Sequence, residues 1–232
     1  MNLKTLIPKQ LKLKFRLIKR NLSDRKIKFA IETNKKTSFQ NIISTTQEIK
    51  KGAFFENKVH NIKTASVKIS SVIIYPNQDF SFWKIIGNPS KKNGFKKGRN
   101  IIKNKISEEI GGGLCQLSSI IYITALKANL EITERHNHSV DIYKEEERFT
   151  PLGSDATVVY GYKDLRIKND FKFPIQFHFS YIENQITCNL ESLEKIEEMK
   201  LDFIRKYKDD IIEVSTTLNA NHHCYSIYKI MA

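Results

Sequence analysis

The sequence predicts one α+β domain, with a buried central helix packed on an antiparallel β-sheet and a basic N-terminal extension in front of it. Three observations support this prediction. No residue between Glu109 and Lys127 is charged, which is typical of a helix covered on most sides. Residues 155–169 and 174–190 alternate apolar and polar side chains, as strands of an antiparallel sheet do. The positive charge, in contrast, is concentrated near the start of the chain.

The chain length sets the domain organisation. The chain has 232 residues, of which 40% are hydrophobic, and this is enough for one well-packed domain with extensions. We expect a basic N-terminal extension at residues 1–55, the domain itself at residues 56–190, and a C-terminal extension at residues 191–232.

The first 51 residues contain fourteen Lys and Arg but three acidic residues, so this segment carries +11 of the formal net charge of +14. Basic segments bind anionic lipids or nucleic acids, or are simply solvated surfaces. In the stretch "QLKLKFRLIKR", Leu11, Phe15 and Ile18 suit one face of a helix, but the same stretch also fits a strand. Peripheral membrane contact and packing onto the domain both remain open, and we expect no nucleic-acid partner.

The remaining elements follow in chain order. Residues 56–74 read as a helix followed by the start of a strand, and residues 76–77 as a turn that leads aromatic residues into the core. Residues 183–184 are predicted to be the tip of the hairpin formed within residues 174–190. Residues 191–212 are charged and compatible with a helix, although their pattern is weak.

The cysteines and the hydropathy pattern bear on the compartment. Three cysteines, Cys115, Cys188 and Cys224, are too few and odd in number for a disulfide framework. The N-terminal stretch interrupts its apolar residues with charges, so we see no secretory signal, and no segment approaches a transmembrane span. We therefore expect a cytoplasmic protein.

The segment "GGGLCQ" suggests a nucleophile. A cysteine at a helix start lies near unpaired backbone N–H groups and the positive end of the helix dipole, which favour a thiolate. Gly112 and Gly113 let a substrate approach the backbone, and Gln116 would add an amide to an oxyanion hole around Cys115. The alternative is a buried structural cysteine after a flexible loop.

The segment "ERHNHSVDIY" would bring a base back to the thiol. On a strand, His136 and His138 point to the same face, and a histidine next to Cys115 can activate it. Asp155 or Asp164 would orient the imidazole, and Asp155 is better placed. The alternatives are a surface pair of histidines, or a zinc site that combines both histidines with the cysteine but lacks a visible fourth ligand. We expect no metal and no cofactor.

Four blocks of the chain together resemble the VanW domain. They are "FSFWKIIG", "GGGLCQLSSIIYITAL", "LEITERHNHSVD" and "GSDATVVYGYKDLRIKN" in this order, and the segment "IPKQLKLKFRLIKRNLSD" resembles the lead-in of short VanW proteins. The resemblance covers about residues 5–190. In multidomain relatives, the domain is associated with L,D-transpeptidation of peptidoglycan, in which a cysteine takes the acyl group of a stem tetrapeptide and passes it to another stem. The resemblance places that cysteine at Cys115 and the histidine block at His136 and His138.

The resemblance and the residues together predict a cysteine acyltransferase that acts on peptidoglycan stem peptides or wall precursors. Cys115 would be the nucleophile, His138 the base with His136 as the other candidate, and Asp155 the orienting group. The candidate substrate-binding residues are Gly112, Gly113, Gln116, Ser118 and Arg135. Wall-crosslinking relatives carry a signal or anchor that this sequence does not show. The alternative is therefore a non-catalytic module that binds wall precursors, for instance as an accessory glycopeptide-resistance factor.

Overall fold

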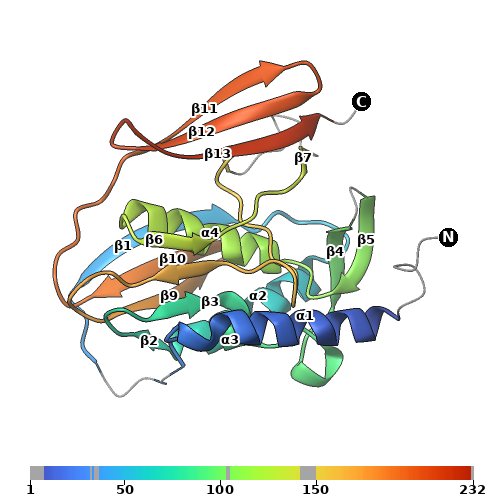
Figure 1. Ribbon diagram of the computed structural model, residues 1–232, viewed down its shortest axis with the longest axis horizontal. Helices are drawn as coiled ribbons and strands as arrows, with labels where there is room; N and C mark the ends of the chain where they lie inside the picture. The colour runs from blue at the N-terminus through green and yellow to red at the C-terminus, as the bar shows by residue number, and fades with distance from the viewer. Residues whose placement is uncertain (1–7, 32, 34–36, 103–104, 142–149, 231–232) are drawn as a thin grey trace.

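The computed structural model describes residues 8–31, 33, 37–102, 105–141 and 150–230, and it shows helices packed among several small sheets (Figure 1). This architecture confirms the predicted α+β class. The α-helices are α1 (Lys9–Ser23), α2 (Phe55–Ser70), α3 (Phe82–Ile86) and α4 (Leu114–Lys127), and two 3₁₀ turns occur at η2 (Asp24–Lys26) and η3 (Lys91–Asn93). Among the described residues, no helix has both the length and the apolar character that a bilayer span requires.

The main sheet has the strand order β1-β10-β9-β2, and all of its pairings are antiparallel. Its strands are β1 (Asn41–Glu48), β2 (Ile73–Ile74), β9 (Ile175–Ile182) and β10 (Gln185–Ser192). The predicted hairpin tip is present, because Glu183 adopts a positive φ of 50° between β9 and β10. The edge strand β1 lies within the predicted N-terminal extension, so part of that segment completes the sheet.

Helix α4 is the buried central helix. Twelve of its fourteen residues are buried, and it packs on β1 and β10 while α2 packs on β9. Its apolar residues, such as Leu117, Ile120 and Ile121, are fully buried in the core shared by the helices and the main sheet. Burial of such side chains contributes roughly 1.5–3 kcal/mol each relative to exposure, so this layer accounts for much of the stability.

Two smaller sheets flank this core. The first has the order β3-β8-β6 and the second is the hairpin β4-β5, which leads into α4. Their strands are β3 (Asp79–Ser81), β8 (Arg166–Lys168), β6 (Glu131–Glu134), β4 (Lys97–Ile102) and β5 (Lys105–Ile110). Of the alternating stretch 155–169, β8 is the part that forms a named strand. Residues 155–158 run past α4, where the hydroxyl of Ser118 binds Ala156, and residues 159–163 form a turn closed by a Val159–Lys163 bridge.

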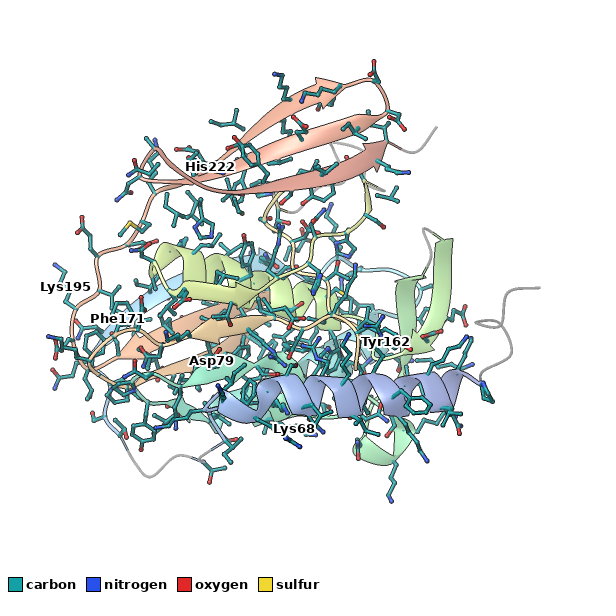
Figure 2. All side chains as sticks on the ribbon, in the orientation of Figure 1. Lys68, Asp79, Tyr162, Phe171, Lys195 and His222 are labelled. Atoms are coloured by element: carbon teal, nitrogen blue, oxygen red, sulfur yellow. The ribbon has the colours of Figure 1, made fainter. Side chains whose placement is uncertain are left out.

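The C-terminal residues form a separate sheet instead of the helix that their charges allowed. Its order is β11-β12-β13-β7, with strands β11 (Leu201–Lys208), β12 (Ile211–Leu218), β13 (Asn221–Ile230) and β7 (Val140–Asp141). The helix interpretation was wrong because one residue in two faces inward: Ile212, Val214 and Tyr228 form a small second core with Leu152. Side chains fill the space between this sheet and α4 (Figure 2).

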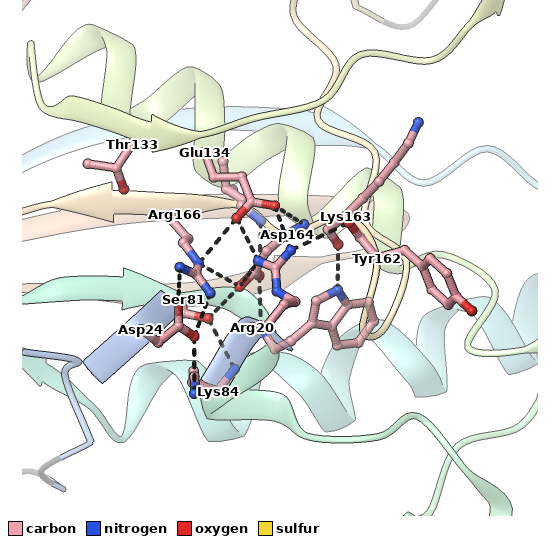
Figure 3. A network of polar contacts seen from close by, with 12 residues as sticks. Arg20, Asp24, Ser81, Lys84, Thr133, Glu134, Tyr162, Lys163, Asp164 and Arg166 are labelled. Carbon is pink, nitrogen blue, oxygen red and sulfur yellow. Dashed lines mark hydrogen bonds and ion pairs between the residues drawn. The ribbon is translucent and has the colours of Figure 1, made fainter. Parts of the chain in front are cut away.

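The basic helix α1 packs against the domain through a polar network (Figure 3). Arg20 of α1 binds both carboxylate oxygens of Glu134, at 3.1 and 2.6 Å. Just beyond α1, the carboxylate of Asp24 accepts two hydrogen bonds from Arg166, at 2.7 and 2.9 Å. Arg166 also lies 3.2 Å from Asp164. The network therefore ties α1 to strands β6 and β8, which supports the packing alternative for one face of this helix.

Candidate functional site

The glycine run forms a turn that only glycine tolerates well. Gly111 and Gly113 have φ values of 94° and 98°, in the left-handed region, and Gly113 caps the start of α4. A Cβ at Gly113 would lie 2.9 Å from Cγ of Lys58 in α2, so space as well as φ requires glycine. Asn61 of α2 holds this turn, because its side-chain amide donates a 3.0 Å hydrogen bond to the carbonyl oxygen of Gly112.

This turn places Cys115 at the second residue of α4, where it is half-buried. Its Sγ lies 3.8 Å from the carbonyl oxygen of Val158. Its own carbonyl accepts hydrogen bonds from the hydroxyls of Ser118 and Ser119, at 3.1 and 2.6 Å. Both serines also bind Ala156, so they fasten the start of α4 to the loop that carries Asp155.

His138 and Asp155 form a close pair beside this cysteine. One carboxylate oxygen of Asp155, Oδ2, lies 2.6 Å from Nδ1 of His138 and also accepts the backbone N–H of His138 at 2.6 Å. Because Nδ1 of His138 contacts Asp155, the other ring nitrogen, Nε2, points away from that carboxylate. Cys115 is close enough to contribute to the raised pKa of His138. The structure thus brings a thiol, an imidazole and a carboxylate together in the order that nucleophilic catalysis uses.

The electrostatics of this pair favour a protonated imidazole. Burial alone would lower the pKa of His138, but hydrogen bonds and charges from Asp155 and Cys115 outweigh burial and raise the pKa to about 10. Burial would raise the pKa of Asp155, but the hydrogen bond to His138 and nearby positive charge hold it at about 2.

The second oxygen of Asp155 is held by groups that sequence reasoning did not identify as a set. Tyr228 of β13 donates its hydroxyl proton to Oδ1, and Arg135 lies 3.3 Å from the same atom. Arg135 also donates to the carbonyls of Asp155 and Gly153, at 2.7 and 2.8 Å, and to Ser226 Oγ at 2.6 Å. The guanidinium of Arg135, which the sequence predicted to bind substrate, is therefore bound to groups of the protein itself. No local sequence signal connects Tyr228 to this site.

The two histidines contact different carboxylates. Strand β6 ends at Glu134, so the predicted strand does not continue through His136 and His138. His136 Nε2 lies 3.0 Å from Oε1 of Glu134, the carboxylate that Figure 3 shows bound to Arg20 of α1. Burial would raise the pKa of Glu134, but hydrogen bonds from His136 and Arg20 lower it to about 2. His136 is thus bound to a carboxylate other than Asp155.

The other predicted site residues are placed as follows. The amide Nε2 of Gln116 donates a 2.8 Å hydrogen bond to the carbonyl oxygen of Glu48 in β1, so this donor is already engaged. The amide oxygen Oε1 of Gln116 is buried without a hydrogen-bond partner. Ser118 is buried and bridges two backbone carbonyls. Asp164 binds Ser81 and the backbone of Trp83, at 2.6 and 3.1 Å, so it does not orient His138. The described residues contain no cluster of three or more metal ligands.

The paired charges predict a specific pH dependence of stability. His138 has a folded pKa raised from 6.5 to about 10, so its contribution is complete below pH 6.5 and is lost as the pH rises toward 10. Asp155 has a folded pKa lowered from 3.8 to about 2, so its contribution is complete above pH 3.8 and is lost as the pH falls toward 2. We expect urea unfolding to show maximal stabilisation by the pair between these limits.

The control for this prediction is His138→Asn, which removes the titrating imidazole. Wild-type protein should lose stability between about pH 7 and pH 10, and the variant should lose less over the same interval. Parallel curves for the two proteins would contradict the ion pair.

Sequence comparisons relate this chain to one protein family. The family model for VanW like protein matches residues 57–191. The chain is 33% identical over 120 residues to the uncharacterized protein YoaR of Bacillus subtilis, a match that covers 52% of this chain and 38% of YoaR. It is 29% identical over 157 residues to the vancomycin B-type resistance protein VanW of Enterococcus faecalis, covering 65% of this chain and 57% of that relative. No solved structure matches the chain.

The chain thus spans about 40 to 60% of the length of the curated relatives that it matches. The family model, however, covers more than half of this chain and includes the glycine turn, Cys115, His138 and Asp155. The protein belongs to the VanW family.

Proposed function

We propose that this protein is a cysteine-dependent acyltransferase that acts on peptidoglycan stem peptides, in the manner of an L,D-transpeptidase. The observation that carries the proposal is the 2.6 Å contact of His138 with Asp155, beside a cysteine at the start of a buried helix that contributes to the raised pKa of His138. Cysteine acyl transfer needs a nucleophilic sulfur, a group that moves protons, and a third group that orients it. The association of multidomain relatives with wall crosslinking supports stem peptides as the substrate class.

In the first half-reaction, the sulfur of Cys115 attacks the carbonyl carbon of a stem-peptide amide. The C–N bond breaks, the acyl group remains on the sulfur as a thioester, and His138 gives its proton to the leaving amine. Because the pKa of His138 is about 10, the imidazole holds that proton at neutral pH. Asp155 stabilises the charged imidazolium and keeps its Nδ1 engaged.

In the second half-reaction, an amine of another stem peptide attacks the thioester carbon. His138, now neutral, accepts the proton of this amine, and the sulfur leaves as a thiolate. Together, the two half-reactions exchange one amide bond for another, and they require no oxidant or cofactor. Attack by water in place of the amine would make the same site an amidase, so access of water decides between crosslinking and trimming.

The experiment that tests the proposal is incubation of the purified protein with disaccharide-tetrapeptide muropeptides, followed by intact-protein mass spectrometry and product analysis. We expect a mass increase equal to one acyl group on the wild type and none on Cys115→Ser. Crosslinked or trimmed muropeptides should appear with the wild type alone.

A matched internal control comes from Cys224, which is half-buried like Cys115 and whose Sγ lies 3.6 Å from the hydroxyl oxygen of Tyr122. Iodoacetamide should label Cys115 at least about tenfold faster than Cys224. Both cysteines are half-buried, so the difference would come from activation of the Cys115 sulfur by the neighbouring His138. Equal labelling, together with no acyl adduct from folded protein, would reject the catalytic proposal in favour of a module that only binds wall precursors.

A further inference from the structure

Helix α1 has two apolar faces, and only one of them is packed on the domain. Leu13 and Leu17 are half-buried and lie against Gly161, and Arg20 on the same side binds Glu134. The opposite face presents four apolar side chains to solvent, with exposed fractions of 43, 59, 56 and 51%: Leu11, Phe15, Ile18 and Leu22. Their spacing of four, three and four residues aligns them in one stripe along the helix.

The charges around this exposed stripe have one sign. Helix α1 contains no acidic residue and carries four lysines and two arginines. At 100° per residue, Lys12 and Lys19 lie about 80° to one side of the stripe and Lys14 about 70° to the other. The stripe therefore has lysines along both edges, and their long apolar stems can lie beside it with the ammonium groups extended outward.

The cations on the packed side are already used within the protein. Arg20 forms the ion pair with Glu134, and Arg16 lies over the ring of Tyr162 at 5.6 Å, next to α1 in Figure 2. In the part of the chain that the structure describes, the lysines of α1 enter no ion pair. Figure 1 shows α1 on the side of the molecule away from the β11-β12-β13 sheet, and the exposed fractions of the stripe show that its outer face meets solvent.

We propose that the outer face of α1 is a docking surface for an anionic phospholipid bilayer. The stripe of Leu11, Phe15, Ile18 and Leu22 would enter the boundary between headgroups and acyl chains, and the flanking lysines would bind lipid phosphates. An apolar stripe with cationic edges and no acidic residue is the pattern of helices that lie in the plane of a membrane. An apolar protein partner would require no such one-signed border, and an acidic protein would not require four aligned apolar residues.

The packed face makes this surface more than a tether. Because Leu13, Leu17 and Arg20 fasten α1 to the body of the protein, a bilayer bound to the outer face would fix the orientation of the whole domain relative to the membrane. This inference is independent of the proposed acyl transfer, since it uses none of the residues around Cys115.

The test is co-sedimentation of the full chain with vesicles of phosphatidylcholine alone and of phosphatidylcholine with about 30% phosphatidylglycerol. We expect strong partition onto the anionic vesicles and at least about tenfold less onto the neutral ones, since each cation near an anionic surface contributes roughly fivefold to partition. Phe15→Asp with Ile18→Asp should reduce partition onto anionic vesicles about a hundredfold or more.

Matched controls separate the stripe from general effects of exposed apolar residues and charge. Val67 in α2 is 71% exposed, and Val67→Asp should leave partition unchanged. Lys12→Gln with Lys19→Gln should reduce binding, whereas Lys92→Gln with Lys195→Gln, at exposed sites elsewhere, should reduce it far less. Circular dichroism checks that each variant is folded.

Three results would overturn the proposal. The first is absence of wild-type binding to anionic vesicles, and the second is equal loss of binding in the Val67 and Phe15–Ile18 variants. The third is a wild-type dimer in sedimentation equilibrium that the Phe15–Ile18 variant converts to a monomer, because the stripe would then be covered by a second copy of the chain.

Discussion

Asp155→Asn is expected to slow acylation of Cys115 by roughly 10²–10⁴-fold while leaving the protein folded. The carboxylate accepts hydrogen bonds from Nδ1 and from the backbone N–H of His138, both at 2.6 Å. An asparagine amide carries no charge to stabilise the imidazolium and can present a donor to Nδ1, which selects the wrong tautomer. The pKa of His138 should therefore fall from its value of about 10.

The rate of iodoacetamide labelling of Cys115 as a function of pH measures this effect without a substrate, and the muropeptide reaction measures it with one. Tyr228→Phe is the graded control, because it removes one hydrogen bond to Oδ1 of the same carboxylate but keeps its charge. We expect the labelling and acylation rates of Tyr228→Phe to lie between those of the wild type and those of Asp155→Asn. If Asp155→Asn labelled and acylated at the wild-type rate, Asp155 would have no part in orienting His138.

Arg166→Ala is expected to destabilise the protein by about 3–5 kcal/mol, because it leaves several carboxylates near one another without their cation. Only 9% of the Arg166 side chain is exposed. Its guanidinium contacts Asp24 at 2.7 Å, Asp164 at 3.2 Å and Glu134 at 3.3 Å. Urea unfolding at neutral pH measures the change in the free energy of unfolding.

Lys168→Ala provides the control on the same strand. Lys168 lies two residues from Arg166 in β8 and pairs with Glu131 at 3.4 Å, but both partners are more than one-third exposed. A solvated pair of this kind contributes about 0–1 kcal/mol. Similar losses in the two variants would mean that the Arg166 network, and with it the attachment of α1, is weaker than its burial implies.

Several features of the fold were accessible from sequence because short-range physics controls them. The uncharged stretch before Lys127 forms α4, and the alternating stretch 174–190 forms the β9-β10 hairpin with its turn at Glu183. The glycines before Cys115 adopt positive φ angles, as a sharp entry into a helix requires. In each case, the residue pattern and the local backbone agree.

Other features were outside the reach of local patterns. The charged segment from residue 201 onward folds as β11 and β12, because Val214 and Tyr228 bury their side chains over Leu152, far away in sequence. Identical residue types also received different partners: His136 binds Glu134 and His138 binds Asp155. The bend after β6 separates them, and a strand pattern does not contain that bend.

The sequence by itself determined that the chain has a VanW-family α+β core. It also predicted a cysteine at the start of a helix that follows a glycine run, with a histidine and an aspartate near that cysteine. The tertiary structure alone decided that Asp155 and not Asp164 faces His138, that Tyr228 and Arg135 hold that carboxylate, and that α1 keeps an apolar face exposed. The physical reason is the distance along the chain over which each interaction acts. Helix, turn and strand patterns depend on neighbouring residues, whereas the partner of a buried charge depends on which distant segments pack together to compensate its desolvation.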